Sequence, residues 1–310
     1  MAEENIVKPF LKWVGGKSQI IELLMARYPE QINNYYDIFL GGGSTLLALL
    51  SYVRDKKIIV TGQIYAYDIN SDLINVYKNV QKYPNELWGK IKKIIDEFYE
   101  CSETDIIRQP KNEKESKTSQ ESYYYWIRQK YNRLSSDEKS GLDSSAMFIF
   151  LNKTCFRGIY RVGPNGLNVP FGHYAGPKII DKETLLSVSQ LIEHVKFKCI
   201  DFTQSLKTPF GQDDFIYLDP PYVQEKKTSF VKYDIAGFDI AQHKRLFAMC
   251  QNLMSNGCQF MMTNSASELV ISSFEKEKYL VDIIECRRAI HAKNPAKKAK
   301  EVIIRTVRNY

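Results

Sequence analysis

The strongest constraint on the fold of this chain is the run Phe215-Ile216-Tyr217-Leu218-Asp219-Pro220-Pro221-Tyr222, in which an apolar segment ends in a carboxylate, two prolines and an aromatic ring. Such a segment predicts a buried strand, and the prolines fix the backbone that follows it. Asp219 and the carbonyl of Pro220 then offer neighbouring acceptors for one NH2 group, beside a Tyr222 ring on which a flat heterocycle can stack. The alternative is an ordinary strand that turns at Pro-Pro, because Asp and Pro are common turn residues.

A glycine-rich turn upstream predicts a second part of the same site. The segment Tyr36-Asp37-Ile38-Phe39-Leu40-Gly41-Gly42-Gly43-Ser44-Thr45 has the pattern of a strand, a glycine turn and the start of a helix. Glycines let the backbone approach a ligand closely, and the helix N-terminus presents unpaired N–H groups to it. A further strand near residues 64–69 contains Asp68, which is placed to hold the two hydroxyls of a ribose.

A competing interpretation comes from Gly15-Gly16-Lys17-Ser18, which resembles the end of a phosphate-binding loop. The earlier glycine of such a loop is missing, and no apolar strand precedes the segment. The glycine turn at 41–43 also lacks the spacing of a dinucleotide fingerprint. The sequence therefore disfavours ATP, GTP or a dinucleotide as the ligand.

Apolar runs that alternate with helical patterns predict the class of fold. Strand-like segments occur near residues 35–40, 64–69, 197–201, 215–219, 258–264, 280–286 and 301–307. Helical patterns occur around residues 17–28, 44–54, 71–82, 184–194 and 240–255. This alternation predicts an α/β fold with a Rossmann-like, mostly parallel seven-stranded sheet and a ligand at the carboxyl ends of its strands.

The pattern changes in the middle of the chain, where polar helices and loops replace the strands. We expect residues 84–183 to form an inserted, mainly helical domain that carries a β-hairpin. Residues 1–83 and 184–310 would then be the first and second parts of the sheet domain. The charged, low-complexity stretch from Lys111 to Gln120 is expected to be mobile.

Basic and aromatic side chains gather within this middle region. No acidic residue lies between Asp143 and Asp181, and the turn Gly163-Pro164-Asn165-Gly166 predicts a hairpin that can reach into a major groove. Residues 153–178 within this segment contain four cations and four aromatic residues: Lys153, Arg157, Arg161, Lys178, Phe156, Tyr160, Phe171 and Tyr174. An ordinary solvated loop is the alternative. A second basic cluster, from Arg287 to Lys300, is expected either to contact phosphates or to be a solvated loop.

Composition agrees with an intracellular enzyme. The chain has 310 residues, 44% of them hydrophobic, and no apolar run approaches the length of a membrane span. We expect no signal peptide. We therefore expect a soluble protein. The formal net charge of +7 is modest evidence for a polyanionic partner. The six cysteines are scattered without ligand spacing, which predicts reduced core thiols and no metal site: Cys101, Cys155, Cys199, Cys250, Cys258 and Cys286.

Taken together, the chain resembles the Dam-like family of DNA adenine-N6 methyltransferases. The resemblance rests on five blocks in order over more than 200 residues: Phe10-Leu11-Lys12-Trp13-Val14-Gly15-Gly16-Lys17, Phe39-Leu40-Gly41-Gly42-Gly43-Ser44, Asp68-Ile69-Asn70-Ser71-Asp72-Leu73, Asn168-Val169-Pro170-Phe171-Gly172 and Asp219-Pro220-Pro221-Tyr222. Their order is similar to the alpha arrangement of amino-methyltransferases. The resemblance implies methyl transfer from S-adenosylmethionine to the N6 amino group of a flipped-out adenine in a short palindromic site of double-stranded DNA.

The resemblance also assigns residues. It implies that the catalytic residues are Asp219, Pro220 and Tyr222. It implies that the cofactor-binding residues are Trp13, Lys17, Phe39, Gly41, Gly43, Asp68, Asp201, Phe202 and Asp219. DNA recognition falls to Lys12, Phe156, Arg157, Ile159, Arg161, Asn168 and Pro170. Several of these match positions used by family members that read GATC. However, the segment 157–166 is one residue shorter than in the bacterial Dam proteins, and Arg157 stands where they carry a small amide, so related four-base sites stay open.

Two other functions remain as alternatives. A similar clamp could methylate an RNA base or a protein amide, although neither substrate explains a hairpin rich in guanine-reading cations. The chain could also be a catalytically silent DNA-binding protein, against which the intact clamp and glycine turn argue. The expected setting is the cytoplasm of a bacterium or a virus-infected cell, and a cognate restriction endonuclease encoded nearby is compatible with the resemblance.

Overall fold

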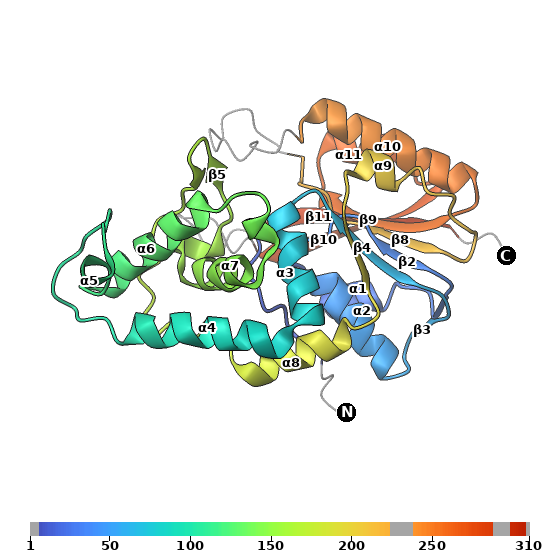
Figure 1. The fold of residues 1–310 in the computed structure, drawn as a ribbon. Coiled ribbons are helices and arrows are strands. Elements are labelled where there is room, and N and C mark those ends of the chain that lie inside the picture. The colour runs from blue at the N-terminus through green and yellow to red at the C-terminus, as the bar shows by residue number, and fades with distance from the viewer. Residues whose placement is uncertain (1–5, 224–237, 288–297, 308–310) are drawn as a thin grey trace. The chain divides into compact units, whose positions relative to one another are not determined.

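The computed structural model describes residues 6–223, 238–287 and 298–307 (Figure 1). The chain divides into two compact units. The first unit comprises Met1–Ile6, Lys17–Ile69 and His194–Tyr310, and the second comprises Val7–Gly16 and Asn70–Glu193. Of the basic cluster expected near the C-terminus, Arg288, Lys293 and Lys297 lie outside the described residues.

The described part of the first unit contains a seven-stranded sheet in the order β10-β11-β9-β8-β2-β4-β7. Its strands are β2 (Tyr35–Asp37), β4 (Ile64–Asp68), β7 (Lys196–Cys199), β8 (Phe215–Leu218), β9 (Gln259–Ser265), β10 (Tyr279–Arg287) and β11 (Lys298–Thr306). β11 pairs antiparallel with β10 and β9, and the other neighbouring strands pair in parallel. The predicted mostly parallel α/β sheet is confirmed.

Three neighbouring parallel strands bring acidic residues to one edge of this sheet. In the register, Asp37 at the end of β2 lies opposite Ala66 of β4 and Tyr217 of β8. Asp68 ends β4, and Asp219 directly follows β8. Because the carboxyl ends of parallel strands share an edge, the three carboxylates meet there.

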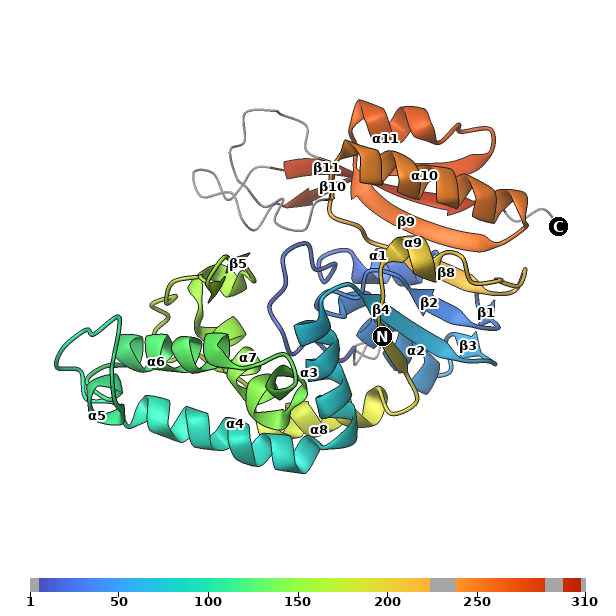
Figure 2. The ribbon, with the colours of Figure 1, turned by 45° about the horizontal axis from the view of Figure 1, so that its top comes forward.

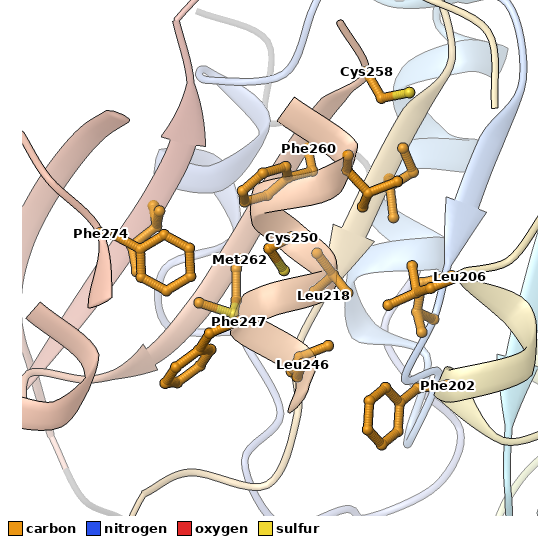
Figure 3. Close-up of a cluster of buried hydrophobic side chains, with 14 of the residues drawn as sticks. Phe202, Leu206, Leu218, Leu246, Phe247, Cys250, Cys258, Phe260, Met262 and Phe274 are labelled. Carbon is orange, nitrogen blue, oxygen red and sulfur yellow. The ribbon is translucent and has the colours of Figure 1, made fainter. Parts of the chain in front are cut away.

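Helices cover both faces of the sheet, with α10 and α11 on one face and α1 and α2 on the other (Figures 1 and 2). Their bounds are α1 (Ile21–Met25), α2 (Ser44–Arg54), α9 (Phe202–Ser205), α10 (Ile240–Ser255) and α11 (Glu268–Ser273). Leu246 and Phe247 of α10 pack in one buried cluster with Leu218 and Phe260 of the sheet (Figure 3). Each such side chain stabilises the fold by about 1.5–3 kcal/mol through apolar burial. A separate parallel pair joins β1 (Gln31–Ile32) to β3 (Ile59–Val60).

The second unit is mainly helical. Its elements are α3 (Ser71–Lys82), α4 (Pro84–Tyr99), α5 (Glu113–Ser116), α6 (Gln120–Arg133), η1 (Glu138–Ser140), α7 (Leu142–Thr154), η2 (Phe156–Gly158), β5 (Val162–Gly163), β6 (Gly166–Leu167) and α8 (Lys182–Leu191). α7 contacts α3, α4 and α6 and is buried around most of its surface. A helix with this burial forms the core of a bundle. β5 and β6 pair antiparallel and are connected by Pro164 and Asn165, as in the predicted hairpin.

Part of the stretch 111–120, which the sequence predicts to be mobile, is helical. Residues Glu113–Ser116 form α5 and Gln120 begins α6, and each helix has a side-chain cap. Asn112 Oδ1 accepts from the Glu115 N–H at 3.0 Å, and Ser119 Oγ accepts from the Ser122 N–H at 3.1 Å. Each cap satisfies an otherwise unpaired backbone donor, so a polar composition is compatible with order here.

The cysteines correct a second expectation. All six are free, but Cys199 is exposed on β7 and Cys101 is only partly buried, whereas the other four lie in the core as predicted. Among the residues that the structure describes, no group of three or more His, Cys, Asp or Glu side chains is placed to hold a metal ion. No helix in the described ranges is both long and apolar enough to cross a membrane.

Candidate active site

Asp219 is held from two sides at the end of a fully buried strand. Lys17 Nζ lies 2.6 Å from its Oδ2, and the hydroxyl of Thr263 donates to its Oδ1 at 2.7 Å. The Lys17 side chain is only 4% exposed, so the ion pair is shielded from water, while Asp219 keeps 19% of its surface accessible. A carboxylate has about four acceptor positions, so the fixed Asp219 can still accept a hydrogen bond from a ligand.

The segment after Asp219 is pinned to the neighbouring strand β9. Asn264 Oδ1 accepts from the Val223 N–H at 3.2 Å, and the hydroxyl of Ser265 donates to the Val223 carbonyl at 2.8 Å. Pro220 is buried between the strand end and this anchor. Sequence reasoning missed β9 as part of the site. The available signal was the polar run Thr263-Asn264-Ser265 at the end of an apolar strand, all three at most 1% exposed.

Tyr222 is fixed at both its hydroxyl and its ring. The hydroxyl donates to Glu301 Oε2 on β11 at 2.9 Å, and Lys17 Nζ lies 4.9 Å from the ring centroid. Burial, together with the negative charges of Asp219 and Glu301, raises the pKa of Tyr222 well above its ordinary value. The ring is therefore neutral and held in place, as a stacking platform requires.

The glycine turn lies beside Asp68, as expected for two segments that follow the carboxyl ends of neighbouring parallel strands. Gly41 and Gly43 have φ values of +49° and +70°, which other residues rarely adopt. Gly43 is the N-cap of α2, and the Gly41 N–H donates to Asp68 Oδ2 at 3.0 Å. The Lys17 N–H donates to the hydroxyl of Ser44 at 3.0 Å, which joins Lys17 to the same turn.

Two aromatic rings border the turn. The Phe39 ring lies 5.8 Å from that of Phe202, and both contribute to the core. Asp201 is the N-cap of α9, where its Oδ1 accepts from the Thr203 N–H at 2.8 Å. Of the residues predicted to bind a cofactor, the first unit thus contains Lys17, Phe39, Gly41, Gly43, Asp68, Asp201, Phe202 and Asp219. Trp13 belongs to the second unit, where its indole stacks on Tyr160 with centroids 5.6 Å apart.

Asp37 is an acidic residue of this edge that the sequence did not single out. It is fully buried, and burial together with the nearby Asp219 charge raises its pKa to about 8. The hydroxyl of Thr45 donates to its Oδ2 at 3.3 Å, which offsets this shift in part. The folded protein therefore keeps Asp37 protonated at neutral pH.

Asp37→Asn should flatten the pH dependence of stability. The unfolded chain releases this proton near pH 4 and the folded chain near pH 8, so the unfolded state binds fewer protons across that window. The free energy of unfolding of the wild type then falls as the pH rises from about 4 to about 8. The Tm of the variant relative to the wild type should therefore be higher at pH 8 than at pH 5, because only the wild type has to keep this proton bound. Asp55→Asn, at an exposed site, is the control, and parallel Tm curves for Asp37→Asn and the wild type would contradict the assignment.

In the second unit, two loops that carry predicted recognition residues are joined by backbone hydrogen bonds. The Phe156 N–H donates to the Pro170 carbonyl at 2.9 Å, and the Gly172 N–H donates to the Thr154 carbonyl at 2.8 Å. Phe156 is 44% exposed, and Pro170 and Arg157 are also exposed. Ile159, in contrast, is only 8% exposed. The structure thus brings Phe156, Arg157 and Pro170 to one surface of this unit.

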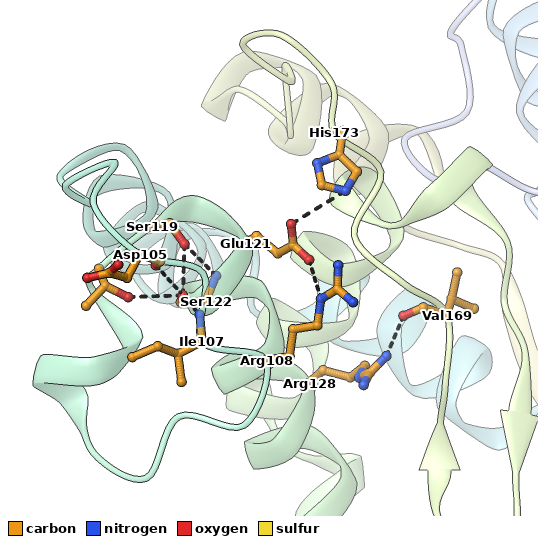
Figure 4. Close-up of polar contacts among 10 residues, drawn as sticks. Asp105, Ile107, Arg108, Ser119, Glu121, Ser122, Arg128, Val169 and His173 are labelled. Atoms are coloured by element: carbon orange, nitrogen blue, oxygen red, sulfur yellow. Dashed lines mark hydrogen bonds and ion pairs between the residues drawn. The ribbon is translucent and has the colours of Figure 1, made fainter.

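Polar side chains of α6 bond to the segment that carries this surface (Figure 4). Tyr124 Oη and Arg128 Nη1 both donate to the Val169 carbonyl, at 2.8 and 2.7 Å. Glu121, which is 4% exposed, lies 2.9 Å from Arg108 Nε and 3.5 Å from His173 Nε2. Sequence reasoning did not find this cluster, because its members are spread from residue 108 to residue 173.

Arg161 and Asn168 form a direct pair at the base of the hairpin. Arg161 Nε donates to Asn168 Oδ1 at 2.6 Å, and Arg161 Nη2 donates to the Asn168 carbonyl at 3.1 Å. These bonds use two of the five N–H donors of the guanidinium. The fork is therefore oriented while it retains donors for a partner.

Lys12 lies in the same unit, beside Lys153. Its Nζ donates to the Lys153 carbonyl at 3.2 Å and sits 4.0 Å from the centroid of the Tyr174 ring. Burial lowers the pKa of Lys12, and burial with the Lys12 charge lowers the pKa of Lys153 to about 8. An anion placed here would relieve the repulsion between these two cations.

Comparison with known proteins identifies the family of this chain. Residues 13–287 match the family model of D12 class N6 adenine-specific DNA methyltransferases. The chain is 34% identical to the Type II methyltransferase M.MjaIII of Methanocaldococcus jannaschii, covering 94% of this chain and 96% of that protein. It is 31% identical to the Type II methyltransferase M1.LlaDCHI of Lactococcus lactis subsp. cremoris, covering 96% and 95%. It is 25% identical to the DNA adenine methylase of Salmonella typhi, covering 96% and 94%.

These matches confirm the resemblance that the motifs predicted, and they extend over nearly the whole chain. The chain therefore belongs to the D12 class of N6 adenine-specific DNA methyltransferases.

Proposed function

We propose that this enzyme transfers a methyl group from S-adenosylmethionine to the N6 atom of an adenine that has flipped out of a short palindromic site in double-stranded DNA, with GATC as the favoured site. The observation that carries the proposal is Asp219, fixed by Lys17 and Thr263 at the carboxyl end of β8. The lone pair of adenine N6 is delocalised into the ring, so the nitrogen is a poor nucleophile. Hydrogen bonds from its two N–H groups to Asp219 and to the Pro220 carbonyl would localise that pair.

The residues of the first unit fit S-adenosylmethionine. Gly41 and Gly43 give a turn without side chains at the N-terminus of α2, and Asp68 is hydrogen-bonded to that turn. Asp68 would accept the ribose hydroxyls, and Phe39 and Phe202 would border the adenine of the cofactor. The cofactor supplies an activated methyl group on a sulfonium. Positioning is then the main contribution of the protein, because reacting atoms held about 3–3.5 Å apart react far faster than free ones.

We assign DNA recognition to the second unit and, in particular, to residues 84–183. Phe156 and Pro170 share an exposed surface with Arg157, and Arg161 is oriented by Asn168. Five residues match recognition positions of GATC-reading family members: Lys12, Phe156, Ile159, Arg161 and Pro170. A stacked base cannot reach Asp219, so the adenine must flip out, at a cost of a few kcal/mol that stacking on Tyr222 offsets in part. Because the substrate is DNA, we place the enzyme in the cytoplasm.

The relatives named Type II methyltransferase support a further proposal, that the chain works in a restriction-modification system with a cognate endonuclease.

The test of the proposed function is to sequence modified bases in DNA from cells that express the chain. N6-methyladenine in one short palindrome, absent from cells expressing Asp219→Asn, is the expected result. Methylation of RNA or protein without N6-methyladenine in DNA would reject the DNA substrate. Methylated adenines in a different palindrome would reject the GATC assignment and leave the rest of the proposed function in place.

Asp68→Ala should remove the stabilisation that the cofactor gives to the wild-type protein. Ligand at 100 times its dissociation constant stabilises a protein by about 2.7 kcal/mol, or roughly 5–10 °C in Tm. The Tm of the wild type should rise by this amount with S-adenosylmethionine, and the variant should shift by less than about 2 °C. Asp55→Ala is the matched control in the same unit and should respond like the wild type. An equal shift with ATP and none with S-adenosylmethionine would instead favour a phosphate loop at residues 15–18.

A further inference from the structure

One carboxylate in the second unit receives donors from three different elements. Asp72 lies in the first turn of α3, and its Oδ2 is 2.6 Å from Tyr131 Oη, 3.2 Å from Tyr160 Oη and 3.4 Å from Lys139 Nζ. Tyr131 belongs to α6, Lys139 to η1, and Tyr160 to the chain leading into the hairpin. The Asp72 side chain is 11% exposed, so these contacts are largely protected from water.

Apolar packing does not close the space beside this carboxylate. A cavity of about 460 Å³ adjoins Asp72 and Asn75 of α3 and the hairpin residues Val162 and Leu167. Tight positioning normally comes from close-packed side chains. The hydrogen bond from Tyr160 to Asp72 spans the edge of this cavity and joins the chain that enters the hairpin to α3. The hairpin itself is bonded to α6, where the side chain of Asn132 pairs with the N–H and carbonyl of Leu167.

Tyr160 lies between two residues of the recognition segment, Ile159 and Arg161. Its ring stacks on Trp13, with centroids 5.6 Å apart and planes at 22°, and lies 5.5 Å from the ring of Phe148. Stacking restrains the plane of the ring, and the hydroxyl contact with Asp72 restrains its position along that plane. Both restraints are passed to Arg161 through one peptide bond.

We propose that Asp72 is a positioning residue for DNA sequence discrimination, acting through the Tyr160 hydroxyl to hold Arg161 at the base of the hairpin. Tyr131 and Lys139 contact the same oxygen of Asp72, but neither belongs to the segment that carries Arg161. This inference rests on the proposed readout of DNA by Arg161. The new element is that a residue of α3, outside the hairpin, determines how accurately Arg161 is positioned.

The test uses two variants that each remove one hydroxyl from the same carboxylate. Tyr160→Phe keeps the ring on Trp13 and removes the tie to the hairpin, whereas Tyr131→Phe removes a hydroxyl of α6, which carries none of the proposed DNA-reading residues. The measurement is kcat/KM with labelled S-adenosylmethionine on a GATC duplex and on duplexes with one substituted base pair, together with the Tm of each protein. Discrimination is the ratio of the two kcat/KM values.

Tyr160→Phe should lower discrimination by about tenfold, the lower end of the effect of one hydrogen bond to a charged group. Tyr131→Phe should leave the ratio within about twofold of the wild type while it lowers the Tm. Asp72→Asn should reproduce the loss of discrimination. An unchanged ratio in Tyr160→Phe, or an equal fall in both Tyr variants, would overturn the inference while the proposed function stands. A wild type that methylates all duplexes alike would overturn the proposed function and the inference with it.

Discussion

Asp219→Asn is expected to reduce methyl transfer by about 30-fold to 1000-fold while the protein still binds DNA. The carboxylate is the charge-assisted acceptor for the adenine amino group, and loss of such an acceptor costs on the order of 2–4 kcal/mol in the transition state. Asn keeps the size of the side chain, which matters because Lys17 is buried against it. The measurement is single-turnover transfer of labelled methyl groups to a duplex, with fluorescence anisotropy for DNA binding.

The control for this prediction is Asp213→Asn, at the opposite end of β8, where the carboxylate is exposed. It should retain wild-type turnover. Asp219→Asn and Asp219→Ala both remove the ion pair of the buried Lys17. Asp219→Ala should lose activity equally but should lower the Tm further, because it also removes the side-chain oxygens that Lys17 and Thr263 contact. Turnover above about a tenth of the wild-type value in Asp219→Asn would reject the clamp.

Arg161→Ala is expected to relax sequence discrimination. The planar guanidinium suits the O6 and N7 edge of guanine, and a lost bidentate contact costs about 1–3 kcal/mol of discrimination. Its orientation by Asn168 supports base contact, since a fork held by two hydrogen bonds meets a base edge with little loss of entropy. Methylation of sites changed at one guanine should therefore gain relative to methylation of the intact GATC duplex.

Arg161→Lys separates base readout from charge. It keeps the charge but not the fork, so it should resemble Arg161→Ala in discrimination and the wild type in salt dependence. If Arg161 touches only phosphates, the Ala variant should weaken all sequences alike and reduce the salt slope by about one charge. The comparison needs kcat/KM on intact and singly substituted duplexes at two salt concentrations, and an unchanged ratio would reject base readout by Arg161.

The sequence by itself indicated the seven strands of the main sheet and the edge at which the site of the first unit lies. It did not indicate the short elements β1, β3, α9 and α11, and the helix expected at 17–28 is present only at Ile21–Met25. A continuous apolar run such as Phe215–Leu218 predicts a central strand from local sequence alone. The structure agrees, because every residue of this strand is buried. Parallel pairing then places Asp68 and Asp219 at one edge, and local glycine geometry fixes the turn at 41–43. These features depend on neighbours in the chain. At residues 111–120 the composition did not reveal the helix caps that Asn112 and Ser119 supply.

Only the tertiary structure decided which side chains hold the site. Lys17 meets Asp219 across about 200 residues of sequence because the strand order places β8 beside β2 and β9, and that order is not written in any local pattern. The same order brings Thr263 to Asp219 and buries Asp37 near its charge, which sets the protonation of Asp37. The anchoring of Tyr160 on Asp72 is likewise a contact between distant segments. Local sequence sets backbone conformation, whereas burial and electrostatics depend on every segment that packs around a group.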